Sequence, residues 1–323
     1  MSETFRIGFR RIAPRIRVNA PSAMRWSLGA LDPEAHVLSG TFVASDGALV
    51  PYRLWQAENP RALVLLLHGA FDYSGAFDEV GPKLREQGLT AFAYDQRGFG
   101  ATASRSYWTG KRRMVKDAVE AILLLRQRYG ERPVFVVGES MGAAVAVHVA
   151  ARARNLNLAG LVLVAPGAVA GMFRLMFGRF VARLLRRFAP ESEIAIERVS
   201  HEELTATSAI RLLSDPLVLR GVRPKMAFGL LELAAHAVDM AHKVSVPALT
   251  MVGTRDDVLR TACITRLHLS LKGEKSWETF KDGPHLLLHW REGERVLERV
   301  LSFIDDRLPA AVPREVAEPA LPQ

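Results

Sequence analysis

The sequence predicts an α/β fold with a mostly parallel central sheet, a leading antiparallel hairpin and a helical insertion. Short runs that are apolar throughout alternate with helix-length segments, which is typical of a parallel sheet whose strands are buried on both faces. This alternation stops at Pro166 and resumes at Ala248. The simplest interpretation is a sheet domain that a helical segment interrupts.

The hairpin is expected within residues 36–56, where two strand-like runs flank the turn pair Asp46-Gly47. Residues 168–242 are expected to be wholly helical. Further strands are expected at 62–67, 89–94, 133–137, 158–164, 248–252 and 276–280, and helices at 77–87, 111–129, 141–154, 259–271 and 292–307.

The chain is therefore divided into five segments. These are a basic N-terminal extension (1–35), a first part of the sheet domain (36–167), the helical insertion (168–242), a second part of the sheet domain (243–308) and a C-terminal tail (309–323). The tail is rich in Pro, Ala and Glu, a composition for which we expect disorder.

The composition indicates a globular protein, because 49% of the residues are apolar and 24% are charged. The single cysteine, Cys263, excludes a disulfide within the chain and a cysteine-based zinc site. No apolar run has the form of a signal peptide or the length of a membrane span. We therefore expect a cytoplasmic protein.

The net charge of +9 is concentrated in two arginine-rich stretches, residues 1–27 and 171–190. Such stretches either form a solvated surface or bind anionic lipid head groups or nucleic acid. The sequence contains no nucleic-acid-binding motif, so we expect no nucleic-acid partner.

The chemistry is indicated by Gly138-Glu139-Ser140-Met141-Gly142, which fits the pattern G-x-S-x-G. The motif follows a buried strand and opens a helix of small residues, the strand–turn–helix setting that it requires. A tight turn of this kind exposes a serine hydroxyl, and its two glycines leave room for neighbouring backbone. Ser140 is therefore the predicted nucleophile.

A serine hydroxyl needs a base and an orienting acid, which follow it in chain order in this type of fold. His285 lies in a loop just after the last expected strand and is the predicted base. Gly253-Thr254-Arg255-Asp256-Asp257 ends another strand and supplies two candidate acids. We prefer Asp256, with Asp257 as the alternative. His148, His268 and His289 are interpreted as structural residues.

An oxyanion formed during acyl transfer is stabilised by two backbone N–H groups in this setting. One is expected from Met141, at the start of the helix after Ser140. The other is expected from Ala70, in the turn His68-Gly69-Ala70-Phe71. His68 itself is interpreted as a hydrogen-bonding residue that shapes the turn.

Together these motifs resemble the monoglyceride lipase and lysophospholipase branch of the α/β-hydrolases, over roughly residues 36–305. The resemblance implies the α/β-hydrolase fold with a helical cap over the site, and it supports Asp256, Ala70 and Met141 in their roles. The family's usual motif has His before the serine, where this chain has Glu139. The other matching motifs are Tyr73-Ser74-Gly75, Tyr94-Asp95-Gln96-Arg97-Gly98-Phe99-Gly100, Ser214-Asp215-Pro216-Leu217 and Gly283-Pro284-His285.

The cap, residues 168–242, contains a segment with helical periodicity at 173–188. Phenylalanines including Phe173 and Phe177 fall on one side, and four arginines lie opposite. The segment either packs on the sheet domain, or its apolar face lines an acyl-chain pocket or touches a bilayer, with the arginines at head-group level. On the second interpretation Phe71, Phe173 and Phe177 contact the substrate.

The expected activity is hydrolysis of carboxylic esters, with monoacylglycerol or lysophospholipid-like lipids as substrates, through an acyl-enzyme. This chemistry requires no metal and no organic cofactor. The alternatives are a short-chain carboxylesterase, thioesterase or carbon–carbon bond hydrolase with the same triad, and, in another class, an inactive lipid-binding module.

Overall fold

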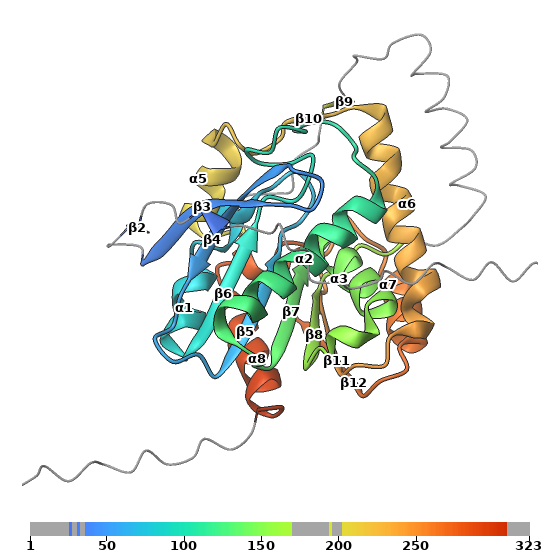
Figure 1. Cartoon of the computed structure of the whole chain (residues 1–323). Helices are drawn as coiled ribbons and strands as arrows, with labels where there is room; N and C mark the ends of the chain where they lie inside the picture. Colours follow the sequence, from blue (N-terminus) through green and yellow to red (C-terminus); the bar gives the residue numbers. More distant parts are fainter. Residues whose placement is uncertain (1–25, 28–30, 33–35, 170–193, 196–201, 309–323) are drawn as a thin grey trace, which may run out of the picture.

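The computed structural model describes residues 26–27, 31–32, 36–169, 194–195 and 202–308. One twisted sheet forms the centre of the molecule (Figure 1), with the strand order β1-β3-β4-β6-β5-β7-β8-β11-β12 and β2 beside β3. The strands are β1 (Trp26–Ser27), β2 (Leu31–Asp32), β3 (Val37–Val43), β4 (Leu49–Trp55), β5 (Ala62–Leu67), β6 (Leu89–Tyr94), β7 (Val134–Glu139), β8 (Gly160–Val164), β11 (Ala248–Gly253) and β12 (Lys275–Phe280).

The sheet changes from antiparallel to parallel pairing, as the sequence predicts. β3 and β4 form the hairpin around Asp46-Gly47, and β4 pairs antiparallel with β6. All pairs from β6 to β12 are parallel. Every residue of β5, β6, β7, β8 and β11 is buried, as their apolar sequences predict.

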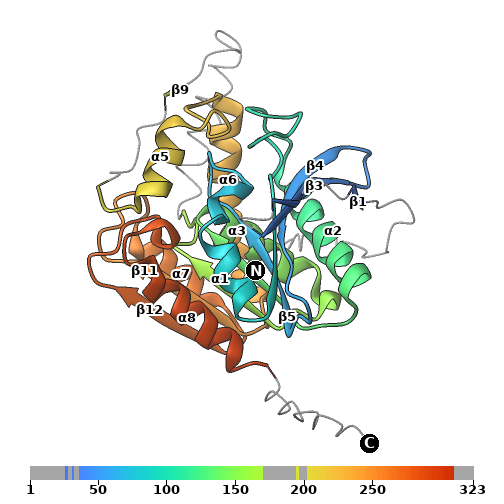
Figure 2. The same cartoon turned by 90° about the vertical axis from the view of Figure 1, so that its left-hand side faces the viewer.

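Helices cover both faces of the sheet. The described helices of the sheet domain are α1 (Val80–Glu86), α2 (Lys111–Tyr129), α3 (Met141–Arg152), α7 (Thr261–Ser270) and α8 (Gly293–Asp305), with short 3₁₀ turns η1 (Ser74–Phe77), η2 (Arg154–Leu156), η3 (Ala241–Lys243) and η4 (Leu287–His289). In Figure 2 α1 and α8 lie on the face turned toward the viewer. The helix expected at 77–87 begins later, at Val80, because a 3₁₀ turn ends at Phe77 and Asp78 and Glu79 form a turn before the helix.

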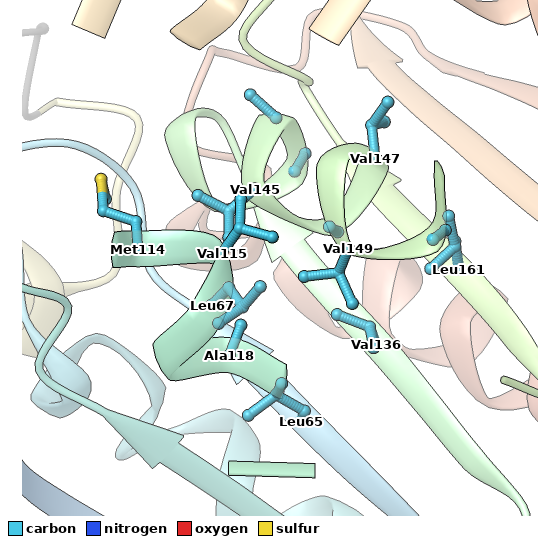
Figure 3. Close-up of a cluster of buried hydrophobic side chains, with 14 of the residues drawn as sticks. Leu65, Leu67, Met114, Val115, Ala118, Val136, Val145, Val147, Val149 and Leu161 are labelled. Carbon is cyan, nitrogen blue, oxygen red and sulfur yellow. The ribbon is translucent and has the colours of Figure 1, made fainter. Parts of the chain in front are cut away.

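The two faces of β5 show how the core is divided. Successive strand residues point to opposite faces, so Leu65 packs into the cluster beneath α2 and α3, and Val64 packs into the cluster beneath α1 and α8. Figure 3 shows the first cluster, to which β5, β7, β8, α2 and α3 contribute side chains. Those labelled are Leu65, Leu67, Met114, Val115, Ala118, Val136, Val145, Val147, Val149 and Leu161.

The described part of the cap contains α5 (Ala206–Ser214), α6 (Pro224–Met240) and the short strands β9 (Ile194–Ala195) and β10 (Gly221–Val222). β9 and β10 pair antiparallel, so the expectation of a wholly helical segment is wrong here. Two-residue strands are too short to produce a period in the sequence. Both α5 and α6 lie at the upper end of the molecule in Figure 2.

Three expectations fall on residues outside the described ranges: the extension 1–35 in most of its length, the helix at 173–188 and the tail 309–323. Within the described ranges, no helix combines the length and apolar character that crossing a bilayer requires.

The division of the core leads to a stability prediction. Leu65 is 0% exposed, whereas Leu269 on α7 is 66% exposed. Leu65→Ala should lower the free energy of unfolding by about 2–5 kcal/mol, because it leaves a cavity between β5 and α2. Leu269→Ala should change it by less than about 0.5 kcal/mol. Urea denaturation measures both, and equal effects would contradict this placement of the core.

Candidate active site

Ser140 stands at the turn between β7 and α3 in a backbone conformation that few residues adopt. Its φ of 51° and ψ of −112° lie outside the regions preferred by residues with a side chain. Such a residue costs on the order of 1–3 kcal/mol and persists only where its surroundings hold it. Here the N–H of Ser140 donates to the carbonyl of Val164, and its own carbonyl accepts from the N–H of Gly167.

The two glycines of the motif are required by contact with backbone. A Cβ on Gly142 would lie 2.0 Å from the carbonyl oxygen of Leu67, and a Cβ on Gly138 would lie 2.5 Å from the N of Ala143. Neither backbone atom can move away without disturbing β5 or α3. The turn therefore requires glycine two residues before and two residues after Ser140, as the motif predicts.

His285 lies in the loop between β12 and η4 and contacts both of its predicted partners. Its Nε2 is 2.9 Å from Oγ of Ser140, and its Nδ1 is 2.8 Å from Oδ2 of Asp256. This is the geometry of a nucleophile, a base and an orienting acid. The three groups come from the ends of β7, β11 and β12.

Asp256 and Asp257 occupy different environments. The side chain of Asp256 is 2% exposed, and its Oδ1 accepts hydrogen bonds of 2.9 Å from the N–H groups of Val258 and Leu259. Asp257 is exposed. Asp256 therefore holds a fixed carboxylate against His285, and the structure favours it over Asp257 as the acid.

The predicted oxyanion donors flank Ser140. Met141 is the first residue of α3, and an N–H in the first turn of a helix has no intrahelical acceptor. The positive end of the helix dipole points to the same place. The turn that carries Ala70 lies against the serine, since a Cβ on Gly69 would be 3.6 Å from Cβ of Ser140.

His68 shapes this turn, as predicted. Its Nδ1 lies 2.7 Å from the carbonyl oxygen of Gly69, and its Nε2 accepts from the N–H of Gln96 at 3.0 Å. The side-chain amide of Gln96 donates to the carbonyl of His68 at 2.8 Å. Burial lowers the pKa of His68, so the ring is a neutral support.

The cap contacts the residues that follow Ala70. Phe71 has a φ of 72°, and its carbonyl accepts from the N–H of Leu219 at 2.8 Å. Arg211 of α5 forms a buried ion pair with Asp72. Phe71, a predicted substrate contact, thus joins the turn to the cap through its carbonyl group. Phe173 and Phe177 lie outside the described residues.

Two motifs matched in the sequence analysis meet at this interface. The hydroxyl of Tyr73 donates to Oδ2 of Asp215 at 2.6 Å. The carboxylate of Asp95 accepts from the N–H groups of Ser74 and Ala101, and Arg97 pairs with Asp46 and Asp117. These residues shape turns near the site.

The remaining histidines fit the structural interpretation. His148 is buried on α3 beside Arg152, and burial lowers its pKa to about 3, so it is neutral. Nδ1 of His268 lies 3.0 Å from Oγ1 of Thr250.

Glu139 and His289 lie together, which the sequence does not predict. Nε2 of His289 is 3.1 Å from Oε2 of Glu139. The sequence marks Glu139 only as a departure from the family motif, and no local pattern links it to a residue 150 positions later.

Metal binding has no candidate residues in the part of the chain that the structure describes. There, no group of three or more His, Cys, Asp or Glu side chains could hold a metal ion.

A family model and several relatives match this chain. The model described as Serine aminopeptidase, S33 (Hydrolase_4) matches residues 58–292. The monoglyceride lipase of Mus musculus is 27% identical over 277 residues, which cover 83% of this chain and 91% of the relative. The monoacylglycerol lipase of Mycolicibacterium smegmatis is 26% identical over 235 residues, 69% of this chain and 80% of the relative.

Solved structures share the fold. A soluble variant of the Saccharomyces cerevisiae monoglyceride lipase, in complex with a substrate analog, has a TM-score of 0.71 at 19% identity and covers 92% of this chain and 100% of its own. A thermostable carboxyl esterase from Bacillus coagulans has a TM-score of 0.70 at 19% identity and covers 84% and 98%. The motif resemblance is thereby confirmed, and the chain belongs to the Hydrolase_4 family of serine hydrolases with the α/β-hydrolase fold.

Proposed function

We propose that this protein hydrolyses carboxylic esters through an acyl-enzyme on Ser140, with monoacylglycerol or lysophospholipid-like lipids as substrates. The observation that carries the proposal is the continuous contact from Ser140 through His285 to Asp256. A serine without a base is a weak nucleophile, and this contact supplies the base and its support.

The residues act in two half-reactions. Oγ of Ser140 attacks the ester carbonyl while Nε2 of His285 takes its proton, and the N–H groups of Ala70 and Met141 bind the resulting oxyanion. The bond to the alcohol then breaks, and His285 gives the proton to the leaving oxygen. Water attacks the acyl-enzyme with His285 again as base, which releases the carboxylic acid and restores Ser140. Asp256 holds His285 in the correct tautomer throughout.

The substrate class is supported by the names of the relatives, which include monoglyceride lipases from a mammal and a bacterium. The same triad also suits a short-chain carboxylesterase, a thioesterase or a carbon–carbon bond hydrolase. The description of the family adds a peptide bond at an N-terminal residue as a substrate to test.

A substrate panel tests the lipid proposal directly. It contains monoacylglycerols of graded chain length, lysophospholipids, short-chain p-nitrophenyl esters, an acyl thioester and aminoacyl p-nitroanilides. The proposal predicts the highest kcat/KM for a long-chain monoacylglycerol or lysophospholipid. A preference for acetyl esters, thioesters or anilides would reject the lipid proposal but not the assignment of Ser140 as the nucleophile.

The nucleophile assignment predicts that Ser140→Ala abolishes ester hydrolysis without unfolding the protein. By analogy with serine proteases, kcat should fall by up to about 10⁶. Covalent labelling of the wild type by a fluorophosphonate should disappear in the variant. A wild type that is not labelled would indicate the alternative of an inactive lipid-binding module.

The acid assignment predicts unequal effects at two adjacent positions. Asp256→Asn should lower kcat by a factor on the order of 10⁴, because the amide presents a donor to His285 and favours the wrong tautomer. Asp257→Asn should change kcat little, since Asp257 is exposed. The reverse order of effects in steady-state kinetics would show that Asp257 is the acid.

We also propose peripheral contact with anionic membrane through the sequence-predicted helix 173–188. Each arginine close to anionic lipid adds about 1 kcal/mol of attraction. Changing Arg179, Arg183, Arg186 and Arg187 to Gln should therefore reduce flotation with phosphatidylserine vesicles, and so should added salt. Hydrolysis of a small soluble ester should be unaffected. Absence of wild-type flotation at low salt would identify the arginines as a solvated surface.

A further inference from the structure

Glu139 is the last residue of β7 and directly precedes the nucleophile. Its side chain is 1% exposed, although a carboxylate is rarely buried without a partner. Glu139 is joined to Ser140 by a peptide bond. A segment that the carboxylate of Glu139 contacts is therefore held at a defined position relative to the nucleophile.

The carboxylate of Glu139 contacts the segment that follows the base. Its Oε1 accepts from the N–H of Leu288 at 3.2 Å, and its Oε2 lies 3.1 Å from Nε2 of His289. His289 is four residues after His285, in the 3₁₀ turn η4. One buried side chain therefore connects the turn that carries the nucleophile to the loop that carries the base.

His289 continues this connection into the cap. Its Nδ1 lies 3.1 Å from Oγ of Ser208 on α5, and this hydroxyl donates its only proton to Oε2 of Glu79 at 2.8 Å. Nδ1 must therefore be the donor toward Ser208. Nε2 makes an ion-pair contact with the carboxylate of Glu139, without the geometry of a hydrogen bond. One ring nitrogen of His289 thus contacts Glu139 and the other contacts Ser208.

Backbone hydrogen bonds join the same two segments. The N–H of Thr205 donates to the carbonyl of His289 at 2.9 Å, and the N–H of Arg291 donates to the carbonyl of Glu203 at 2.9 Å. The loop after His285 thus lies between Glu139 on one side and the start of α5 on the other.

We propose that Glu139 and His289 are positioning residues that hold the loop of His285 at the correct distance from Ser140. The inference rests on the proposed function, because it concerns the efficiency of the same triad. His285 Nε2 and Ser140 Oγ are 2.9 Å apart, and a displacement of about 1 Å in such a pair costs about 10²-fold in rate.

The choice of variants follows from the contacts. Glu139→Leu removes both links to the loop and fills nearly the same volume. Glu139→Gln keeps nearly the same shape, and its amide oxygen can still accept from the N–H of Leu288. His289→Leu removes the ring that contacts both Glu139 and Ser208. Ser208→Ala removes only the hydroxyl that links His289 to α5.

His268→Leu is the matched control. His268 is also buried, and its Nδ1 also lies beside a hydroxyl, 3.0 Å from Oγ1 of Thr250. It lies on α7 and contacts no member of the triad. A loss of stability alone should therefore appear equally in His268→Leu and His289→Leu.

The experiment measures three quantities for the full-length protein. These are the melting temperature, the second-order rate of Ser140 labelling by a fluorophosphonate, and kcat and KM for a soluble p-nitrophenyl ester, all rates being taken well below each melting temperature. We expect Glu139→Leu and His289→Leu to slow labelling and lower kcat by about 10²-fold with KM little changed. Glu139→Gln should restore most of the rate, and His268→Leu should keep the wild-type rate.

Wild-type labelling rates in Glu139→Leu and His289→Leu would overturn the inference, as would equal slowing in His268→Leu. If the leucine variants do not fold, Ser208→Ala decides: slower labelling supports the inference, and an unchanged rate overturns it. Failure of the proposed function is distinguishable. If the protein is not a serine hydrolase, the wild type itself is not labelled, and if only the lipid preference is wrong, the wild type is labelled and the comparison of variants on the soluble ester still applies.

Discussion

The site depends on the backbone conformation of Ser140. A positive φ at a serine is unfavourable in isolation, so β7 and α3 must hold it from both sides. They can do so because all of β7, and all of α3 except Arg152, is buried in the core and because Gly138 and Gly142 let them approach each other closely. A side chain at either glycine would collide with backbone that belongs to the core. The position of the Ser140 hydroxyl and the packing of the core therefore depend on the same two glycines.

Parallel pairing explains how residues far apart in the sequence meet at this hydroxyl. The ends of β7, β11 and β12 lie at the same edge of the sheet, and ligands of open α/β sheets bind at this edge. The cap separates β8 from β11 in sequence, yet these two strands pair directly. Because the pairing is parallel, the chain leaves β8 at its carboxyl end and enters β11 at its amino end, and α6, which packs against α3, forms the crossover between them. A long insertion thus leaves the register of the sheet unchanged.

The sequence allowed the strands, most helices and the positions of Ser140, His285 and Asp256 to be predicted. These features have local signals: apolar runs, glycine turns and motifs that end strands. The bounds of α2 were predicted correctly, and Gly130 marks its end. The contact between Glu139 and His289 and the ion pair between Arg211 and Asp72 were not predicted, since pairing across the fold leaves no periodic signal.

Several contacts that were not predicted join the cap to the site. On one side of Ser140, Arg211 and Leu219 bind the turn that follows Ala70. On the other side, Thr205 and Ser208 bind His289, beyond the loop of His285. Because α5 carries contacts to both sides, it links the turn that carries Ala70 to the loop that carries His285. We therefore infer that the described part of the cap helps to hold these two segments in place around Ser140.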